Sequence, residues 1–118
     1  MIDNQQPCFA VMTTTVQIHQ ALTQLIAEHE TYHWAVAWAS TGFKAEQALR
    51  QAPNWGGKVV IGLHFWQTSP DFVHKYSRNP AIRFHLATSG VFHPKVYLFS
   101  SSDGRWAAIV GSSNFTGG

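Results

Sequence analysis

The sequence has little cysteine, little charge and no long apolar run. The single cysteine, Cys8, excludes an intrachain disulfide framework, and no role is assigned to it. The expected location of the protein is a reducing cytoplasm. No stretch approaches the roughly 20 apolar residues of a membrane helix, and the N-terminus lacks a cationic start before an apolar run, so neither a membrane segment nor a signal peptide is expected. Charged residues make up only 12% of the chain, which excludes a disordered, solvating chain.

The charge balance is mildly basic. Eight Lys and Arg against six Asp and Glu give a net charge of +2, and seven histidines add charge near neutral pH. A dedicated nucleic-acid-binding surface is more basic, so a polyanionic partner would have to be recognised by a few placed residues. With 118 residues, of which 45% are hydrophobic, one domain over residues 1–118 is expected. Because Gly118 directly follows a turn-like segment, we expect a longer parent protein.

Alternating helix and strand patterns predict an α/β fold. Helical spacing predicts helices over residues 16–29, 43–52 and 70–77. Ser69 is the expected N-cap of the last helix, with Pro70 at its first position. Apolar runs predict strands over residues 32–39, 58–63, 81–87, 96–99 and 106–110. Helices between the first strands imply parallel crossovers, whereas the last two strands form an antiparallel hairpin, so the prediction is a mixed β-sheet flanked by helices, with strand 32–39 buried on both sides.

Two segments near the C-terminus carry the candidate catalytic groups. His93 and Lys95 lie two residues apart at the start of a strand, so their side chains point to the same face. The next strand ends in the sequence GSSN, residues 111–114, which places hydroxyl and amide groups beside the histidine and the lysine. We expect these groups to converge at one edge of the sheet.

This arrangement resembles the signature of the phospholipase D superfamily, a His-x-Lys strand followed by a Gly-Ser-x-Asn turn on the adjoining strand. The matching positions are His93, Lys95, Gly111, Ser112 and Asn114. The surrounding sequences, HPKVYLF and IVGSSNFTGG, look most like the single-motif nuclease branch, which includes metal-independent restriction endonucleases and nuclease domains attached to helicases. The resemblance implies a phospholipase D-like α-β-α sandwich whose C-terminal hairpin carries the motif.

The resemblance further implies metal-independent hydrolysis of phosphodiester bonds, in DNA rather than RNA, without a cofactor. Neutral His93 attacks phosphorus to form a phosphohistidine. Lys95 and Asn114 hold the non-bridging oxygens, and Ser112 is a further donor. Because one chain supplies one such histidine and a second must protonate the leaving group, a homodimer with one shared site is expected. The expected parent proteins are restriction or helicase-linked systems.

Two parts of the family pattern are missing from this sequence. The acid that usually follows the lysine by five residues falls on Ser100, and a carboxylate about ten residues beyond the asparagine would lie past Gly118. An inactive family member that binds nucleic-acid phosphates or a partner subunit is therefore one alternative function. A phosphodiesterase that acts on phospholipids is another, although the sequence has no membrane segment and no cationic amphipathic helix to favour it.

Four further residues are expected to bind substrate. They are His64, Ser113, Lys75 and Arg78. His64 follows a predicted parallel strand, whose carboxyl end opens onto a ligand crevice, so it could line the phosphate site; the alternative is a polar residue that simply leaves a buried strand. The two cations could form a basic and aromatic groove for a nucleic-acid strand, although a solvated surface is the default interpretation of scattered cations. Its other members would be Arg83, Tyr76 and Trp66.

Two other patterns have plainer interpretations. The five tryptophans are expected mainly in the core and at a dimer interface. The sequence HETYH, residues 29–33, spells the HExxH zinc signature, but the alternating strand pattern begins at Tyr32. We therefore expect His29 and His33 on different elements and predict no metal site.

Overall fold

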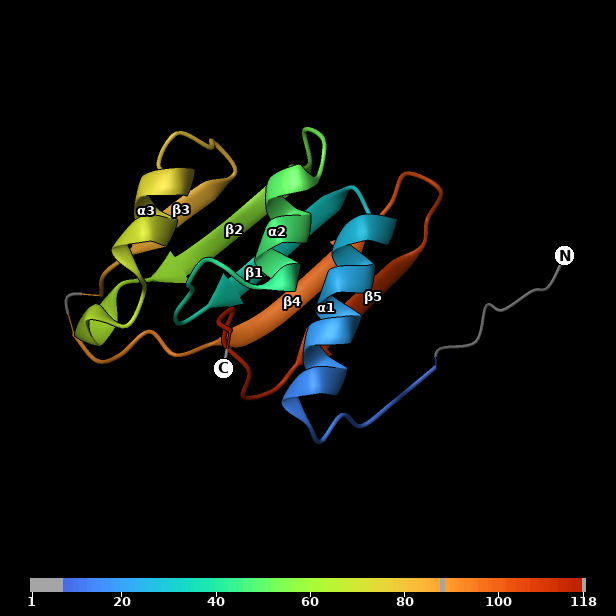
Figure 1. Ribbon diagram of the computed structural model, residues 1–118, viewed down its shortest axis with the longest axis horizontal. Coiled ribbons are helices and arrows are strands. Elements are labelled where there is room, and N and C mark those ends of the chain that lie inside the picture. Colours follow the sequence, from blue (N-terminus) through green and yellow to red (C-terminus); the bar gives the residue numbers. More distant parts are fainter. Residues whose placement is uncertain (1–7, 88, 118) are drawn as a thin grey trace, which may run out of the picture.

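The structure is a computed structural model that describes residues 8–87 and 89–117. Its elements follow one another as α1, β1, α2, β2, η1, α3, β3, β4 and β5 (Figure 1). The α-helices are α1 (Thr15–Glu28), α2 (Lys44–Gln51) and α3 (Pro70–Tyr76), and η1 (His64–Trp66) is a 3-10 turn. The strands are β1 (Thr31–Val36), β2 (Gly56–Gly62), β3 (Ile82–His85), β4 (Lys95–Ser100) and β5 (Trp106–Val110).

The strands form one mixed sheet, so the predicted α/β class is confirmed. Their order is β3-β2-β1-β4-β5. β1 pairs parallel with β2, and β2 with β3, across the helical crossovers predicted from the sequence. β4 pairs antiparallel with both β1 and β5, and Lys95, its first residue, lies opposite Val36, the last residue of β1. The carboxyl end of β1 therefore meets the start of β4 at one edge of the sheet.

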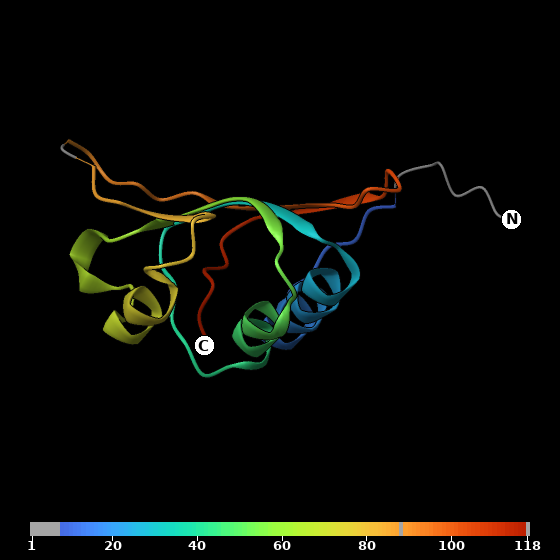
Figure 2. The same ribbon diagram turned by 90° about the horizontal axis from the view of Figure 1, so that it is seen from above.

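The described helices lie on one face of the sheet (Figure 2). In β1 the large side chains of Tyr32, Trp34 and Val36 are buried, whereas His33 between them is exposed. The prediction that this strand is buried on both sides is therefore wrong, because its small and polar residues face away from the helices. A second helical layer, as in the expected sandwich, is not found among the residues that the structure describes.

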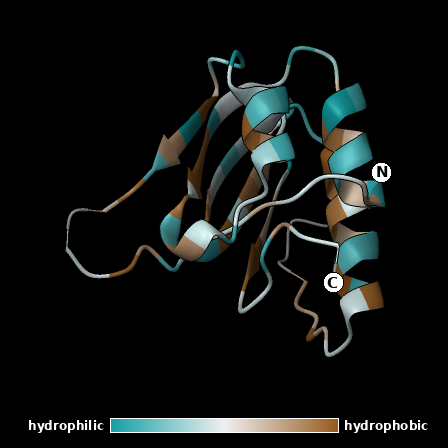
Figure 3. Cartoon of the chain, turned by 60° about the vertical axis from the view of Figure 1, so that its left-hand side comes forward, coloured by the Kyte–Doolittle hydropathy of each residue, from teal (hydrophilic) through white to brown (hydrophobic). Residues whose placement is uncertain are grey.

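The core is an aromatic cluster between the sheet and the helices. The Trp34 ring lies 5.1 Å from both the Tyr97 ring and the Phe115 ring. Phe115 is fully buried, its N–H donates to the Trp38 carbonyl, and its own carbonyl accepts from Ser40 N–H. In Figure 3 the strands carry brown segments between white and teal ones, and the helices alternate between teal and brown as amphipathic helices do. The core thus anchors the chain at the residue that directly follows the GSSN turn.

The helix caps agree with the sequence pattern. Ser69 accepts a hydrogen bond from Phe72 N–H, and Pro70 is the first residue of α3, as predicted. Thr14 and Gln17 form a capping box at the start of α1. Strand 32–39 is shorter than predicted, because the chain leaves the sheet after Val36 and only Ala39 re-forms a bridge, to Phe115.

A buried carboxylate joins α2 to α3. Glu46 is fully buried and accepts hydrogen bonds from Gly42 N–H, at 3.0 Å, and from the Tyr76 hydroxyl, at 2.7 Å. Arg50 Nε lies 3.1 Å from Glu46 Oε2. Burial raises the pKa of Glu46, but the hydrogen bonds from Gly42, Tyr76 and Arg50 outweigh it and lower the pKa below 4.5. Tyr76 therefore belongs to the core and not to the predicted groove.

Substitution Glu46→Gln is expected to lower the free energy of unfolding by about 1–3 kcal/mol at neutral pH, because it removes the charge that holds these donors. A carboxylate whose pKa is lowered on folding contributes stability above its unfolded pKa and loses it as the pH falls through the folded pKa. The difference between wild type and variant should therefore shrink as the pH falls below 4.5. Urea unfolding at several pH values measures it, with the exposed Glu28→Gln as control; a difference that does not change with pH would contradict this role.

Candidate functional site

The predicted pair His93 and Lys95 lies at the edge where β4 begins. Lys95 Nζ is 2.8 Å from His93 Nδ1, 3.1 Å from Nε2 and 3.1 Å from the His93 carbonyl oxygen. His93 is exposed, whereas Lys95 is only 8% exposed. The imidazole is therefore open to solvent, with the ammonium group directly beside it.

The charge of Lys95 is not neutralised by a carboxylate. The two ion pairs formed within residues 8–87 and 89–117 are Arg50–Glu46 and Arg105–Asp103, and neither includes this lysine. Burial lowers the pKa of Lys95, because it disfavours the charged ammonium. A buried cation without a counter-ion is costly for the fold, and an anion bound beside it would remove that cost. This part of the site is therefore suited to an anionic group.

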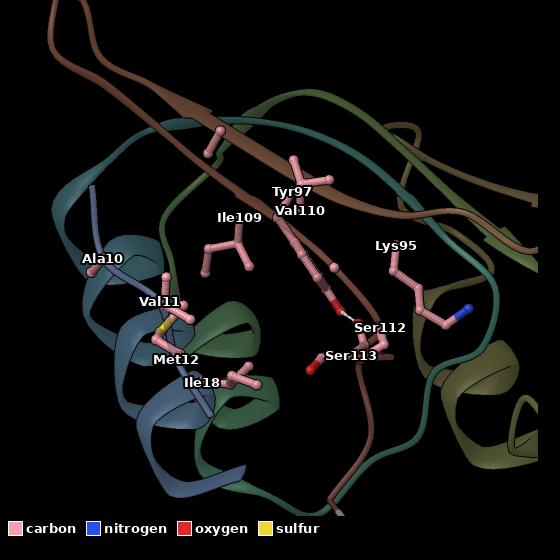
Figure 4. A pocket seen from close by; sticks show the side chains of 12 residues that line it. Ala10, Val11, Met12, Ile18, Lys95, Tyr97, Ile109, Val110, Ser112 and Ser113 are labelled. Carbon is pink, nitrogen blue, oxygen red and sulfur yellow. Dashed lines mark hydrogen bonds between the residues drawn. The ribbon is translucent and has the colours of Figure 1, made fainter. Parts of the chain in front are cut away.

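The GSSN turn lies beside the lysine, as predicted. Gly111 N–H donates to the Lys95 carbonyl, at 3.2 Å, and the Ser113 carbonyl accepts from the Tyr97 hydroxyl, at 2.8 Å. Ser112 and Lys95 line the same pocket, of about 300 Å³ (Figure 4). These contacts place Ser112 and Lys95 at the same margin of the pocket, with the Lys95 ammonium group pointing away from its interior (Figure 4).

Asn114 is held from the other side of the site. Its Oδ1 accepts from Trp38 N–H, at 3.2 Å, just beyond the end of β1. With the oxygen turned to the backbone, the NH₂ group is the donor that Asn114 can offer to a ligand. The four predicted catalytic residues thus come from two neighbouring strand ends at one edge of the sheet.

Trp38 connects these groups, and the sequence did not predict it as part of the site. Its ring lies edge-to-face with the His93 ring, at 5.1 Å between centroids, and 5.8 Å from Lys95 Nζ. Its Nε1–H donates to the His64 carbonyl, at 2.9 Å. Its position at the carboxyl end of a predicted parallel strand could have indicated a place in the site. However, Trp38 alternates with small residues, and this pattern is typical of a core residue.

The pocket also has an apolar wall. Figure 4 shows Val11 and Met12 of the N-terminal segment and Ile18 of α1 facing the hydroxyl-bearing turn across the pocket, with Ile109 of β5 beside them. The sequence pattern had not indicated that the N-terminal segment takes part in the site. The pocket therefore combines a hydroxyl-bearing side, formed by Ser112 and Ser113, with an apolar side.

The predicted substrate-binding residues are placed differently. His64 is only 8% exposed, and both of its ring nitrogens lack a hydrogen-bond partner within the described chain, while its carbonyl is bound to Trp38. Lys75 and Arg78 are exposed at the C-terminal end of α3 and beyond it, whereas the N-terminal end of this helix follows the turn at His64 (Figure 1). They therefore lie toward the opposite edge of the sheet from Lys95.

The departures from the family pattern persist in three dimensions. Ser100 lies at the far end of β4 from Lys95, opposite Thr31. Asp103 is bound to Arg105 Nε, at 2.8 Å, in the turn before β5. No carboxylate from the β4–β5 connection therefore replaces the acid that the family carries after its lysine.

The HExxH pattern does not have the geometry of a zinc site. His29 caps the C-terminal end of α1 and His33 lies on β1, so the two histidines are on different elements, as predicted. Among residues 8–87 and 89–117, no group of three or more His, Cys, Asp or Glu side chains is arranged to hold a metal ion.

No protein-family model matches the chain, and no curated protein matches its sequence. Within the part of the chain that the structure describes, no helix is long and apolar enough to cross a membrane.

Proposed function

We propose that this protein is a phospholipase D-like phosphodiesterase that cleaves nucleic acid, DNA rather than RNA, without a metal ion. The observation that carries this proposal is the buried, uncompensated ammonium of Lys95 beside the exposed imidazole of His93. A phosphodiester is an anion that repels nucleophiles, so a cation beside the nucleophile favours attack on it. A hard metal ion such as Mg²⁺ requires oxygen ligands, whereas the group beside the imidazole here is a cation.

The reaction proceeds in two displacements. An imidazole nitrogen of His93 attacks phosphorus, a P–N bond forms, and the P–O bond to the leaving alkoxide breaks. A second histidine protonates that alkoxide and then takes a proton from water, whose oxygen attacks phosphorus and breaks the P–N bond. The products are a phosphate monoester and an alcohol, and His93 is regenerated. Lys95, Ser112 and Asn114 hold the non-bridging oxygens in both steps.

The second histidine is expected to be His93 of a second copy of the chain. His64, which Trp38 connects to the site, is buried and therefore poorly placed to donate a proton to a leaving group in solvent. Two chains related by a two-fold axis would bring two exposed His93 side chains together, in the shared site that the motif resemblance implies. A phospholipase D-like arrangement, with the motif on the hairpin of β4 and β5, belongs to the same proposal, whereas the described residues supply helices for one face of the sheet (Figure 2).

A binding module without catalysis is the second candidate. It is favoured by the serine at position 100 and by the engagement of Asp103 with Arg105, which leave the site without the family's supporting acid. Such a module would hold phosphate groups through Lys95 and Ser112 but leave them uncleaved.

Cleavage assays on single- and double-stranded DNA, RNA and phosphatidylcholine vesicles test the proposal. We expect the purified chain to cleave DNA in the presence of EDTA and to form a labelled protein adduct that is labile in acid and stable in alkali. Cleavage abolished by EDTA would overturn the metal-independent mechanism. Salt-dependent binding of DNA with no cleavage would favour the binding module, and release of lipid headgroups alone would favour a phospholipase.

A further inference from the structure

The turn after β2 exposes two aromatic side chains on an unusual backbone. Phe65 is 63% exposed and Trp66 is 95% exposed. Their φ angles are +59° and +58°, in the left-handed region that bulky residues rarely adopt. Such a conformation persists only where its surroundings impose it, and it is concentrated at functional sites. These two neighbouring, solvent-exposed aromatic side chains are therefore a candidate ligand-binding surface.

Hydrogen bonds hold the turn at both ends. The His64 carbonyl accepts from Trp38 Nε1–H, at 2.9 Å, and from Gln67 N–H, at 3.3 Å. The buried Thr68 hydroxyl donates to the Gly62 carbonyl, at 2.6 Å, and accepts from Ala39 N–H, at 3.2 Å. These hydrogen bonds hold the backbone of the turn in place before any ligand binds. Less conformational entropy would therefore be lost when a ligand binds to the two rings.

The same contacts connect the turn to the candidate site. The Trp38 ring lies 5.1 Å from the His93 ring, and its indole N–H binds the carbonyl of His64. Trp66 is two residues further along the chain, a span of at most about 7 Å. The aromatic turn is therefore connected to the candidate site through the His64 carbonyl and the Trp38 ring.

An unpaired nucleobase is the ligand that fits this surface. Bases stack on exposed aromatic rings in proteins that bind single strands, and every base offers a face for it. A base within a duplex already has stacked neighbours on both faces and would have to leave them first. A membrane would call for a broader apolar surface with cations around it, whereas this turn presents two rings followed by the exposed, uncharged Gln67.

We propose that Trp66, with Phe65, forms a stacking subsite for an unpaired base next to the phosphate site, and that the substrate is single-stranded nucleic acid. This inference rests on the proposed function. Of the basic and aromatic groove considered from the sequence, only this aromatic turn remains part of the proposal. Tyr76 is buried, and Lys75 and Arg78 lie toward the edge of the sheet opposite Lys95.

Binding of labelled oligonucleotides to the full chain tests the subsite, in a His93→Ala background that prevents cleavage. The probes are a single strand with bases, an abasic strand of equal length, and a duplex. We expect the strand with bases to bind about 5- to 150-fold more tightly than the abasic strand. Trp66→Ala should reduce this ratio to below about 2, and Trp66→Phe should retain most of it, because phenylalanine also stacks.

The matched control is Trp106→Ala. Trp106 is 70% exposed at the start of β5, the end of that strand away from the GSSN turn, and the ratio should be unchanged when it is replaced. The subsite is overturned if Trp66→Ala leaves the ratio of affinities for the two strands unchanged. It is also overturned if Trp66→Ala weakens binding to phosphatidylcholine vesicles but not to the strand with bases. Failure of the proposed function is a separate result, because it would appear as a wild type that binds strands with bases preferentially but cleaves none.

Discussion

If the proposed reaction takes place, substitution His93→Ala is expected to lower the rate of phosphodiester cleavage by about 10⁴-fold or more, because it would remove the atom proposed to form the covalent intermediate. His93 is exposed, so the variant should unfold at nearly the same denaturant concentration as the wild type. The matched control is His33→Ala, an exposed histidine on the helix-free face of β1, which should retain full activity. The measurement is single-turnover cleavage of a labelled oligonucleotide, with acid-quenched samples examined for the phosphohistidine.

The same variant tests whether two chains share one site. If each site needs His93 from both copies, a mixed dimer is inactive, and an equal, fully exchanged mixture of wild type and His93→Ala retains about one quarter of the wild-type activity. Independent sites would retain about one half. Retention of activity by the His93→Ala protein alone would exclude His93 as the nucleophile.

Substitution Lys95→Met is expected to lower activity by about 10²- to 10³-fold and, at the same time, to stabilise the protein. The ammonium group would hold a non-bridging oxygen in the transition state, and removal of one such donor has effects of this size. The side chain is buried without a carboxylate, so an apolar chain of similar length relieves the burial of a charge, by about 1 kcal/mol in the free energy of unfolding.

The gain in stability should depend on pH in a defined direction. Burial lowers the pKa of Lys95, so the folded state loses this proton at a lower pH than the unfolded state does. The stability of the wild type therefore rises with pH between these two values, and the advantage of the methionine variant shrinks. Lys58→Met, at an exposed lysine of β2, serves as control and should change neither activity nor stability by more than about 0.5 kcal/mol. A Lys95→Met protein that is less stable and fully active would make Lys95 a structural residue.

Most of the secondary structure was predictable because it depends on local patterns. Ser69 and Pro70 mark the start of α3 by their own hydrogen-bonding and ring geometry. The strand over 32–39 shows where such patterns fail, since Trp38 continues the alternation after β1 has ended at Val36. Its ring is partly buried against His93 beyond the sheet, and a local pattern cannot distinguish that environment from the core.

The sequence by itself determined which chemical groups meet at the site. A spacing of two residues on an extended chain sets His93 and Lys95 beside each other, and the adjoining strand brings Ser112 close, whatever surrounds them. Only the tertiary structure decided that Lys95 would lack a carboxylate and that Trp38 would bridge His93, the Asn114 amide and the turn at His64. These contacts join segments that are far apart in the chain, so they depend on the order of strands in the sheet and on packing against the core, which local spacing does not specify.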